Sequence, residues 1–190
     1  MSRYSQDKID KSRQAIEKSA SELFRLKGYH GVGLAEITKS AGLTNGTFYA
    51  HFKSKRDLFE QVINRTNQGR SKFFETLKST NKLEQARKFV EIYLSVQHFK
   101  NEKAGCLMPR LAADLKEHWL AKHKSPKKYI DDFTDFFIQT GLSKTESQFI
   151  TASLVGTLVT ARTLPSSEGL SFLEMNKKII LNYIKHKLKE

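Results

Sequence analysis

Apolar residues recur along this chain at the spacing of helical stripes. In the segment 8–27, the apolar positions fall at i, i+4, i+7 and i+8, namely Ile16, Ala20, Leu23 and Phe24. Comparable stripes predict a series of longer amphipathic helices over residues 54–78, 82–100, 106–117, 126–140, 144–163 and 168–188. No segment sustains an alternation of apolar and polar residues with period two. We therefore expect an all-α protein without a sheet.

Two short helical segments, 34–40 and 44–51, follow the first stripe and are joined by a tight turn. Gly28 is placed to end the preceding helix, because glycine adopts positive φ without strain. Gly33 and Thr44 stand at the expected N-caps of the two short helices. Two helices crossing at a small-residue turn, here Ala41 and Gly42, form the pattern of a helix-turn-helix.

The second short helix divides into an apolar and a polar side. Phe48 and Phe52 are four positions apart and share a face, so we expect them to form a small core with Ile37 and Phe24. The opposite side and the helix starts carry groups that suit bases and phosphates. The predicted DNA-facing set is Gly33, Thr44, Asn45, Gly46, Thr47, Tyr49, His51 and Lys55.

The side chains in this set can contact either bases or phosphates. Asn45 can bond adenine through both ends of its amide, and Thr47 offers a hydroxyl and a methyl group. Tyr49, His51 and Lys55 are phosphate donors, which position a protein without reading sequence. The alternative is a plain helical hairpin with a polar exterior.

The stretch "FRLKGYHGVGLAEITKSAGLTNGTFYAHFKSKRDLFEQVI", residues 24–63, resembles the N-terminal DNA-binding region of the TetR family of bacterial transcriptional regulators. The matching elements keep their spacing without a gap: Leu23-Phe24, Gly28-Tyr29, Ile37, Ala41-Gly42, Gly46, Phe48-Tyr49, His51-Phe52, Ser54-Lys55 and Leu58. Many family members carry Thr or Ser where this chain has Val32 and Gly33, a departure that concerns a phosphate contact, for which the Gly33 amide remains. The position of Asn45 is often Lys or Arg in the family, so the base preference of its members does not transfer.

The resemblance implies an all-helical homodimer with two domains. Residues 1–57 would form the helix-turn-helix DNA-binding domain, and residues 58–190 a bundle for ligand binding and dimerisation. The expected function is a repressor that a small effector releases from a palindromic operator. Action as an activator, or as a thiol-based sensor, remains the alternative.

The net charge of +13 changes this picture only slightly. A basic protein suits a polyanion such as DNA, but a lysine-rich surface without a specific ligand has the same charge.

The C-terminal two-thirds contains one further motif and a concentration of aromatic residues. "AGCLMPRLAADL", residues 104–115, resembles a Gly-Cys-Leu segment found in a subgroup of the family. Cys106 stands near Lys103 and Arg110 at an expected helix start, which favours the reactive thiolate; simple packing is the alternative. From the resemblance we expect an effector pocket, with candidate contacts Phe89, Tyr93, Cys106, Trp119, Phe133 and Phe137.

The last two helices are the expected dimer surface. Ala152 and Gly156 are four apart and permit close helix approach. The final helix carries a wide apolar stripe that can cover both a core and a partner: Phe172, Leu173, Ile179, Ile180, Tyr183 and Ile184. Arg162 is expected to pair with an acid at this interface.

Several other functions lack support in the sequence. The single cysteine allows no intrachain disulfide, and no signal peptide or membrane span is recognisable, so we expect a cytoplasmic protein. His98, His118 and His123 lack metal-ligand spacing, and no nucleophile elbow, P-loop or dinucleotide motif occurs. We expect no metal, no cofactor and no enzymatic activity.

Overall fold

The computed structural model describes residues 3–108, 110 and 125–188. Its helices are α1 (Arg3–Lys27), α2 (Leu34–Ser40), α3 (Asn45–Tyr49), α4 (Lys55–Thr76), α5 (Lys82–Tyr93), α6 (Val96–Lys100), α8 (Ser125–Ile138), α9 (Lys144–Thr163) and α10 (Ser166–Lys187). The described residues contain no strand. The prediction of an all-α protein is confirmed.

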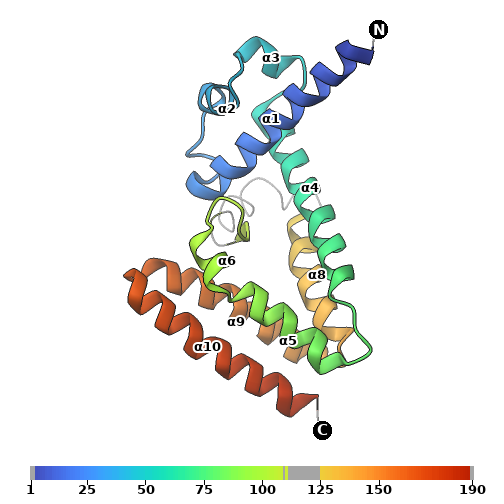
Figure 1. Ribbon diagram of the computed structural model, residues 1–190, viewed down its shortest axis with the longest axis vertical. Helices are drawn as coiled ribbons and strands as arrows, with labels where there is room; N and C mark the ends of the chain where they lie inside the picture. The colour runs from blue at the N-terminus through green and yellow to red at the C-terminus, as the bar shows by residue number, and fades with distance from the viewer. Residues whose placement is uncertain (1–2, 109, 111–124, 189–190) are drawn as a thin grey trace.

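The helices form a small N-terminal group and a larger bundle, which α4 connects (Figure 1). Helices α1 to α3 lie together at one end of the molecule, and α4 runs from there to the opposite end. The bundle comprises α5, α8, α9 and α10, with α9 and α10 side by side. Because α4 belongs to both groups, it connects the bundle directly to the N-terminal helices.

The N-terminal group closes around the aromatic core that the sequence predicted. The side chains of Phe24, Ile37, Phe48 and Phe52 are all buried. Phe24 also meets Phe59 of α4 edge to face, with ring centroids 5.0 Å apart. Such edge-to-face pairs contribute beyond their buried area and fix how α4 leaves the group.

The predicted helix boundaries in this group depend on local capping. Gly28 and Gly42 have φ values of 76° and 69°, a conformation in which a Cβ would be strained. The Thr44 side chain accepts a hydrogen bond from the Thr47 amide, and Ser54 accepts one from Asp57. The first contact confirms the N-cap predicted at Thr44, and the two contacts together start α3 and α4 at fixed positions.

The predicted continuous helix over 82–100 is wrong, because the chain breaks between α5 and α6. The Ser95 hydroxyl accepts a hydrogen bond from the His98 amide at 3.0 Å and caps a new helix. Leu94 just before it is completely buried and leaves the helical conformation. A serine cap and one deeply buried leucine therefore replace the Gly or Pro that usually marks such a break. The predicted helix over 106–117 lies mostly outside the described residues.

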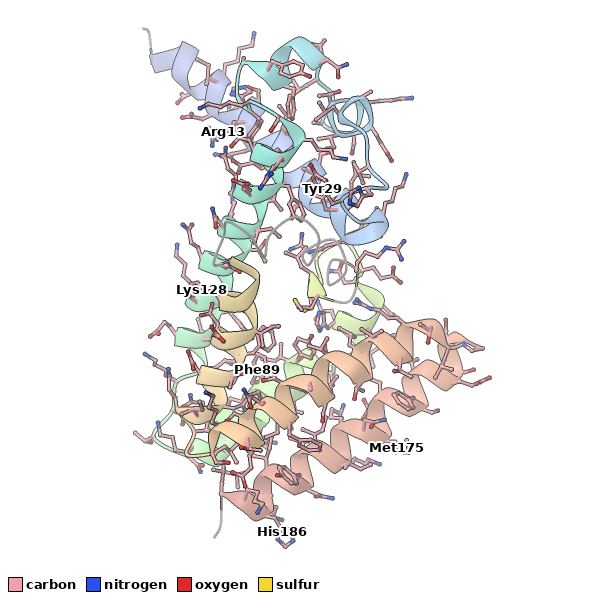
Figure 2. All side chains as sticks on the ribbon, turned by 180° about the vertical axis from the view of Figure 1, so that it is seen from behind. Arg13, Tyr29, Phe89, Lys128, Met175 and His186 are labelled. Atoms are coloured by element: carbon pink, nitrogen blue, oxygen red, sulfur yellow. The ribbon has the colours of Figure 1, made fainter. Side chains whose placement is uncertain are left out.

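The bundle core is built around Phe89 of α5, which Figure 2 shows among the bundle helices. Its ring lies within 6.3 Å, centroid to centroid, of six other aromatic rings, those of Phe73, Phe74, Tyr93, Phe133, Phe136 and Phe137. Several of these pairs are edge to face, the arrangement that ring quadrupoles favour. This cluster holds α4, α5 and α8 together.

Candidate DNA-binding surface and effector pocket

The start of α3 presents a compact polar surface. The Thr44 and Thr47 hydroxyls lie 3.1 Å apart, and Thr44 also accepts from the Thr47 amide at 3.3 Å. Asn45 and Gly46 between them are exposed, while Phe48 on the other side is buried. The burial of Phe48 thus fixes which side of this short helix faces outward.

The Asn45 side chain is oriented from within the protein. Its Oδ1 accepts a hydrogen bond from the Thr38 hydroxyl at 2.8 Å, and Thr38 is buried in α2. An amide oxygen has a second lone pair, and the amide nitrogen has two N–H groups. Asn45 can therefore meet a base through both ends while Thr38 holds it in place.

Gly33 at the start of α2 and Gly46 in α3 are both exposed, and packing within the protein requires a glycine at neither position. A Cβ at Gly33 would have no atom within 4 Å, and one at Gly46 would meet only the Thr44 hydroxyl at 3.8 Å. The backbone of Gly33 has a φ of −93°, which any residue adopts. The absent side chains instead leave room for an outside partner to approach the backbone closely.

Tyr49 extends this surface at the end of α3. It is 63% exposed, and its ring packs edge-on against Phe48 with centroids 5.3 Å apart. A phenol anchored through its ring holds its position at low entropic cost, which suits contact with a fixed partner.

His51 and Lys55 hold the N-terminal group together. His51 Nε2 lies 2.7 Å from the Ser12 hydroxyl of α1. Lys55 Nζ donates to the carbonyls of Tyr29 and Val32 at 2.9 and 2.8 Å and lies 4.2 Å from the centre of the Tyr29 ring. Both side chains thus have internal partners, a structural role that the sequence did not indicate.

A pocket of about 400 Å³ opens between the N-terminal group and the bundle. The structure brings four predicted contacts to its wall: Phe89, Tyr93, Cys106 and Phe133. Phe137 is not among its lining residues because it is completely buried in the aromatic core. Trp119 lies outside the described residues.

Sequence analysis missed the polar side of this pocket, which Arg25, Thr66, Arg70 and His98 line. One signal was available in the helical spacing. Arg70 falls seven residues after Ile63 and three after Asn67, on the buried face of α4. A charged residue on a buried stripe indicates either an ion pair or a binding site.

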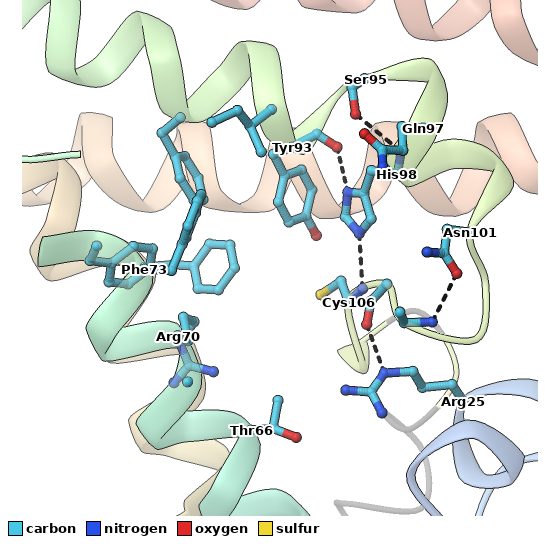
Figure 3. Close-up of a pocket in the computed structure, with 17 residues that line it drawn as sticks. Arg25, Thr66, Arg70, Phe73, Tyr93, Ser95, Gln97, His98, Asn101 and Cys106 are labelled. Carbon is cyan, nitrogen blue, oxygen red and sulfur yellow. Dashed lines mark hydrogen bonds between the residues drawn. The ribbon is translucent and has the colours of Figure 1, made fainter. Parts of the chain in front are cut away.

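A chain of hydrogen bonds leads from this pocket into α1 (Figure 3). His98 Nδ1 lies 2.6 Å from the Tyr93 carbonyl, and its Nε2 accepts from the Cys106 amide at 2.9 Å. The Gly105 carbonyl, which belongs to the same peptide bond as the Cys106 amide, accepts a hydrogen bond from Arg25 Nε at 2.8 Å. The pocket wall and the last turn of α1 are therefore directly connected.

These contacts require His98 to be neutral, with its proton on Nδ1. Burial lowers the pKa of His98, the Tyr93 carbonyl partly opposes this shift, and the nearby charge of Arg162 adds to it. A protonated ring would have no lone pair for the Cys106 amide.

Arg162 binds backbone carbonyls of α6, while the acidic partner expected for it at the dimer interface stays a prediction. It donates to the carbonyls of His98 and Phe99 at 2.6 and 3.2 Å. These carbonyls lie at the C-terminal end of a helix, where a cation is favourable. The guanidinium therefore fastens α6 to α9.

The outer side of α9 and α10 carries apolar residues that no described element covers. Phe149, Met175 and Ile179 are each more than half exposed, and Figure 2 shows Met175 at the outer edge of α10. Phe149 and Tyr183 stack across the two helices with centroids 5.2 Å apart. Ala152 and Gly156 are also exposed, so the centre of α9 has no bulky side chain. We call this surface the α9–α10 face.

None of the described helices is long and apolar enough to cross a membrane. Within the described ranges, no three His, Cys, Asp or Glu side chains are grouped as metal ligands.

Some known proteins match this chain over its N-terminal region alone, and others match it over most of its length. Residues 16–62 match the family described as "Bacterial regulatory proteins, tetR family". The HTH-type transcriptional regulator LmrA of Bacillus subtilis is 30% identical over 171 residues, covering 84% of this chain and 90% of LmrA. The regulator AcrR of Shigella flexneri is 40% identical over 62 residues, covering 33% of this chain but only 29% of AcrR.

Solved structures share the whole fold. E. coli NemR in its reduced form has a TM-score of 0.77 at 19% identity, covering 90% of this chain and 95% of NemR. A TetR transcriptional regulator from Chloroflexus aurantiacus has a TM-score of 0.72 at 19% identity, covering 95% and 98%. The similarity thus extends over the bundle as well as the N-terminal helices.

Proposed function

The chain is a transcriptional regulator of the TetR family, and from this premise we propose that it is a homodimeric repressor released from a palindromic operator by a small effector. The observation that carries the proposal is the division of α3. Phe48 is buried, while Asn45, Gly46 and Tyr49 are exposed on one surface. Its site of action would be the cytoplasm, where a bacterial operator lies.

Recognition would place α3 in the major groove. Asn45 would read a base, with Thr47 beside it, and Tyr49 would contact the backbone. The amides at the start of α2, after Gly33, and at the start of α3, after Thr44, would face phosphates. His51 and Lys55 would support this surface from behind, because their side chains bind α1 and the loop before α2. Residues 1–57 would thus be the DNA-binding domain.

Dimerisation would use the α9–α10 face of residues 58–190. A two-fold partner would cover Phe149, Met175 and Ile179, and it would hold two α3 helices about one DNA turn apart. An effector in the pocket would change the relative position of the two DNA-binding domains, which couples the two sites. The same parts could act as an activator, since nothing in them sets the sign of regulation.

The test is a DNA-binding titration with the chromosomal fragment that flanks the coding sequence and with a scrambled duplex. A specific regulator should prefer its operator by roughly a thousandfold or more. Equal affinity for both duplexes would favour a nonspecific DNA-coating protein, and binding to neither would contradict a DNA-binding role. Asn45→Ala should relax the preference at one base pair without abolishing binding.

A second candidate function is thiol sensing through Cys106. Cys106 lines the pocket, and its backbone amide donates a hydrogen bond to His98. Modification of the Cys106 sulfur would therefore disturb the hydrogen bonds that lead to Arg25. Treatment with N-ethylmaleimide should then weaken operator binding in the wild type and leave Cys106→Ser unchanged. Equal loss in both proteins would exclude this role.

A further inference from the structure

We propose that Thr38 is a positioning residue for base recognition, and that it fixes the Asn45 amide in the orientation that selects adenine. This inference rests on the proposed function, because it names the base that Asn45 reads and the residue that sets this preference. Thr38 lies in α2 and is only 2% exposed, so its influence on DNA has to pass through Asn45.

The turn between α2 and α3 holds Thr38 and Asn45 in a fixed relation. The Thr38 carbonyl accepts a hydrogen bond from the Leu43 amide at 2.9 Å, which fastens the end of the turn to α2. Thr44, just before Asn45, caps α3 by accepting from the Thr47 amide. The backbone is thus constrained at both residues, and the Thr38 hydroxyl lies 2.8 Å from Asn45 Oδ1.

The Thr38 hydroxyl has one proton and three acceptors within reach. Asn45 Oδ1 is the nearest at 2.8 Å, while the carbonyls of Leu34 and Ala35 lie at 3.1 and 3.2 Å. Both carbonyls belong to α2, and a carbonyl within a helix already accepts the amide four residues later. The shortest contact therefore directs the proton to Asn45.

This hydrogen bond decides which end of the Asn45 amide is presented to DNA. The amide oxygen is turned toward Thr38, so the two N–H groups of the exposed Asn45 side chain are available to a partner, with the second lone pair of Oδ1 beside them. In the major groove, adenine presents an acceptor, N7, beside a donor, its N6 amino group. The two edges are complementary, so this orientation selects adenine.

The other three bases fit this orientation less well. Guanine places a second acceptor opposite the amide oxygen, thymine presents O4 beside its methyl group, and cytosine offers an amino group without an acceptor. The reverse orientation of the amide would present its oxygen outward and would suit cytosine instead. The Thr38 hydroxyl thus chooses between two opposite preferences of one side chain.

Thr38 has a competing explanation as an ordinary helical threonine. Its hydroxyl would then donate to the Leu34 carbonyl, four residues earlier, as threonines within helices commonly do. In that case DNA alone would orient Asn45, and loss of the hydroxyl would leave the base preference unchanged. This difference decides the experiment.

The experiment uses the full-length protein to select duplexes from a pool with a randomised centre, and the bound duplexes are sequenced. Asn45→Ala identifies the base position that Asn45 reads, because the preference at that position is lost. We expect the wild type to prefer adenine there by about tenfold over each other base, the discrimination of a good bidentate contact.

Two substitutions separate the hydroxyl of Thr38 from its packing. Thr38→Val keeps the shape of the side chain without the hydroxyl, and it should lower the adenine preference by roughly two- to tenfold, the worth of one hydrogen bond, at this position only. Thr38→Ser keeps the hydroxyl and should retain the preference. In the Asn45→Ala background, Thr38→Val should change no base preference. If Thr38→Val does not fold by circular dichroism, Thr38→Ala replaces it with the same expected result.

The outcomes separate this inference from the function on which it rests. The proposal is overturned if no base position depends on Asn45, if that position prefers another base, or if Thr38→Val keeps the full adenine preference. A loss that is spread over several positions, that also occurs in Thr38→Ser or that persists in the Asn45→Ala background would show a structural role for Thr38 and overturns it as well. Selection of no sequence at all by the wild type would instead contradict the regulatory function itself.

Discussion

Lys55 lies beside the proposed DNA surface, yet its ammonium group is bonded to the protein itself. Two carbonyls, of Tyr29 and Val32, accept hydrogen bonds from it, and it also lies against the Tyr29 ring. It thereby joins the first turn of α4 to the loop that leads into α2. Sequence spacing places the residue correctly, but only the folded chain shows what its charge meets.

Lys55→Met should lower the melting temperature by a few degrees, because it removes two hydrogen bonds from a charged donor, worth about 1–3 kcal/mol together. Lys53→Met is the matched control, since Lys53 is exposed two residues earlier. Differential scanning calorimetry measures both. An unchanged melting temperature in Lys55→Met would contradict this structural role.

His98 should make stability depend on pH. Burial lowers its folded-state pKa, so below the unfolded value of about 6.5 the unfolded chain binds the proton more readily. The contribution to stability is complete above that pH and is lost progressively as the pH falls toward the folded-state value.

Urea unfolding at pH 7 and pH 5 tests this expectation. The wild type should lose stability between these values, and His98→Gln should lose less. His186→Gln, at an exposed position on α10, should behave as the wild type. The same pH dependence in His98→Gln as in the wild type would assign the effect to other groups.

At the scale of elements, short-range chemistry made most helices predictable. Ser143 forms a complete capping box with Glu146, and α9 covers the predicted range from Lys144 to Thr163. The break between α5 and α6 escaped prediction because burial of Leu94, a tertiary contact, helps to place it. Helix ends with their own caps can thus be read locally, while ends set by packing cannot.

The proposed dimer depends on two helices, α9 and α10, which together form the α9–α10 face. Ile179→Lys should shift the protein to monomers at micromolar concentration, because it places a charge in the centre of an apolar contact. Sedimentation velocity measures the change. Lys178→Ala, at an exposed adjacent position, is the control and should remain a dimer. A dimeric Ile179→Lys protein would locate the interface elsewhere.

At the scale of the whole molecule, the loop before Cys106 connects the bundle to the N-terminal helices. A Cβ at Gly105 would lie 2.9 Å from the Asn101 carbonyl and 3.0 Å from Arg162, distances that real Cβ atoms rarely show. The loop would have to shift, and the Gly105 carbonyl would move away from Arg25.

Gly105→Ala should therefore speed amide hydrogen exchange both in the loop and in the last turn of α1, which Arg25 links. Mass spectrometry of peptides covering residues 20–28 and 98–108 measures this. Gly69→Ala, where a Cβ meets no atom within 4 Å, is the control and should leave both peptides unchanged. Faster exchange confined to the loop would argue against coupling through this contact.

The sequence by itself determined the helix-turn-helix, because its glycine turns, hydroxyl caps and phenylalanine spacing act within a few residues of each other. It also indicated four of the pocket residues and the apolar stripes of the last helices. Only the tertiary structure decided which charges meet. Arg25 and Arg70 are 45 positions apart but line one pocket, while Lys55 and His51 turn to internal partners. The physical reason is the sequence separation of the interacting residues. A helix cap or an apolar stripe depends on neighbours along the chain, whereas the partner of a charged side chain depends on how distant helices pack.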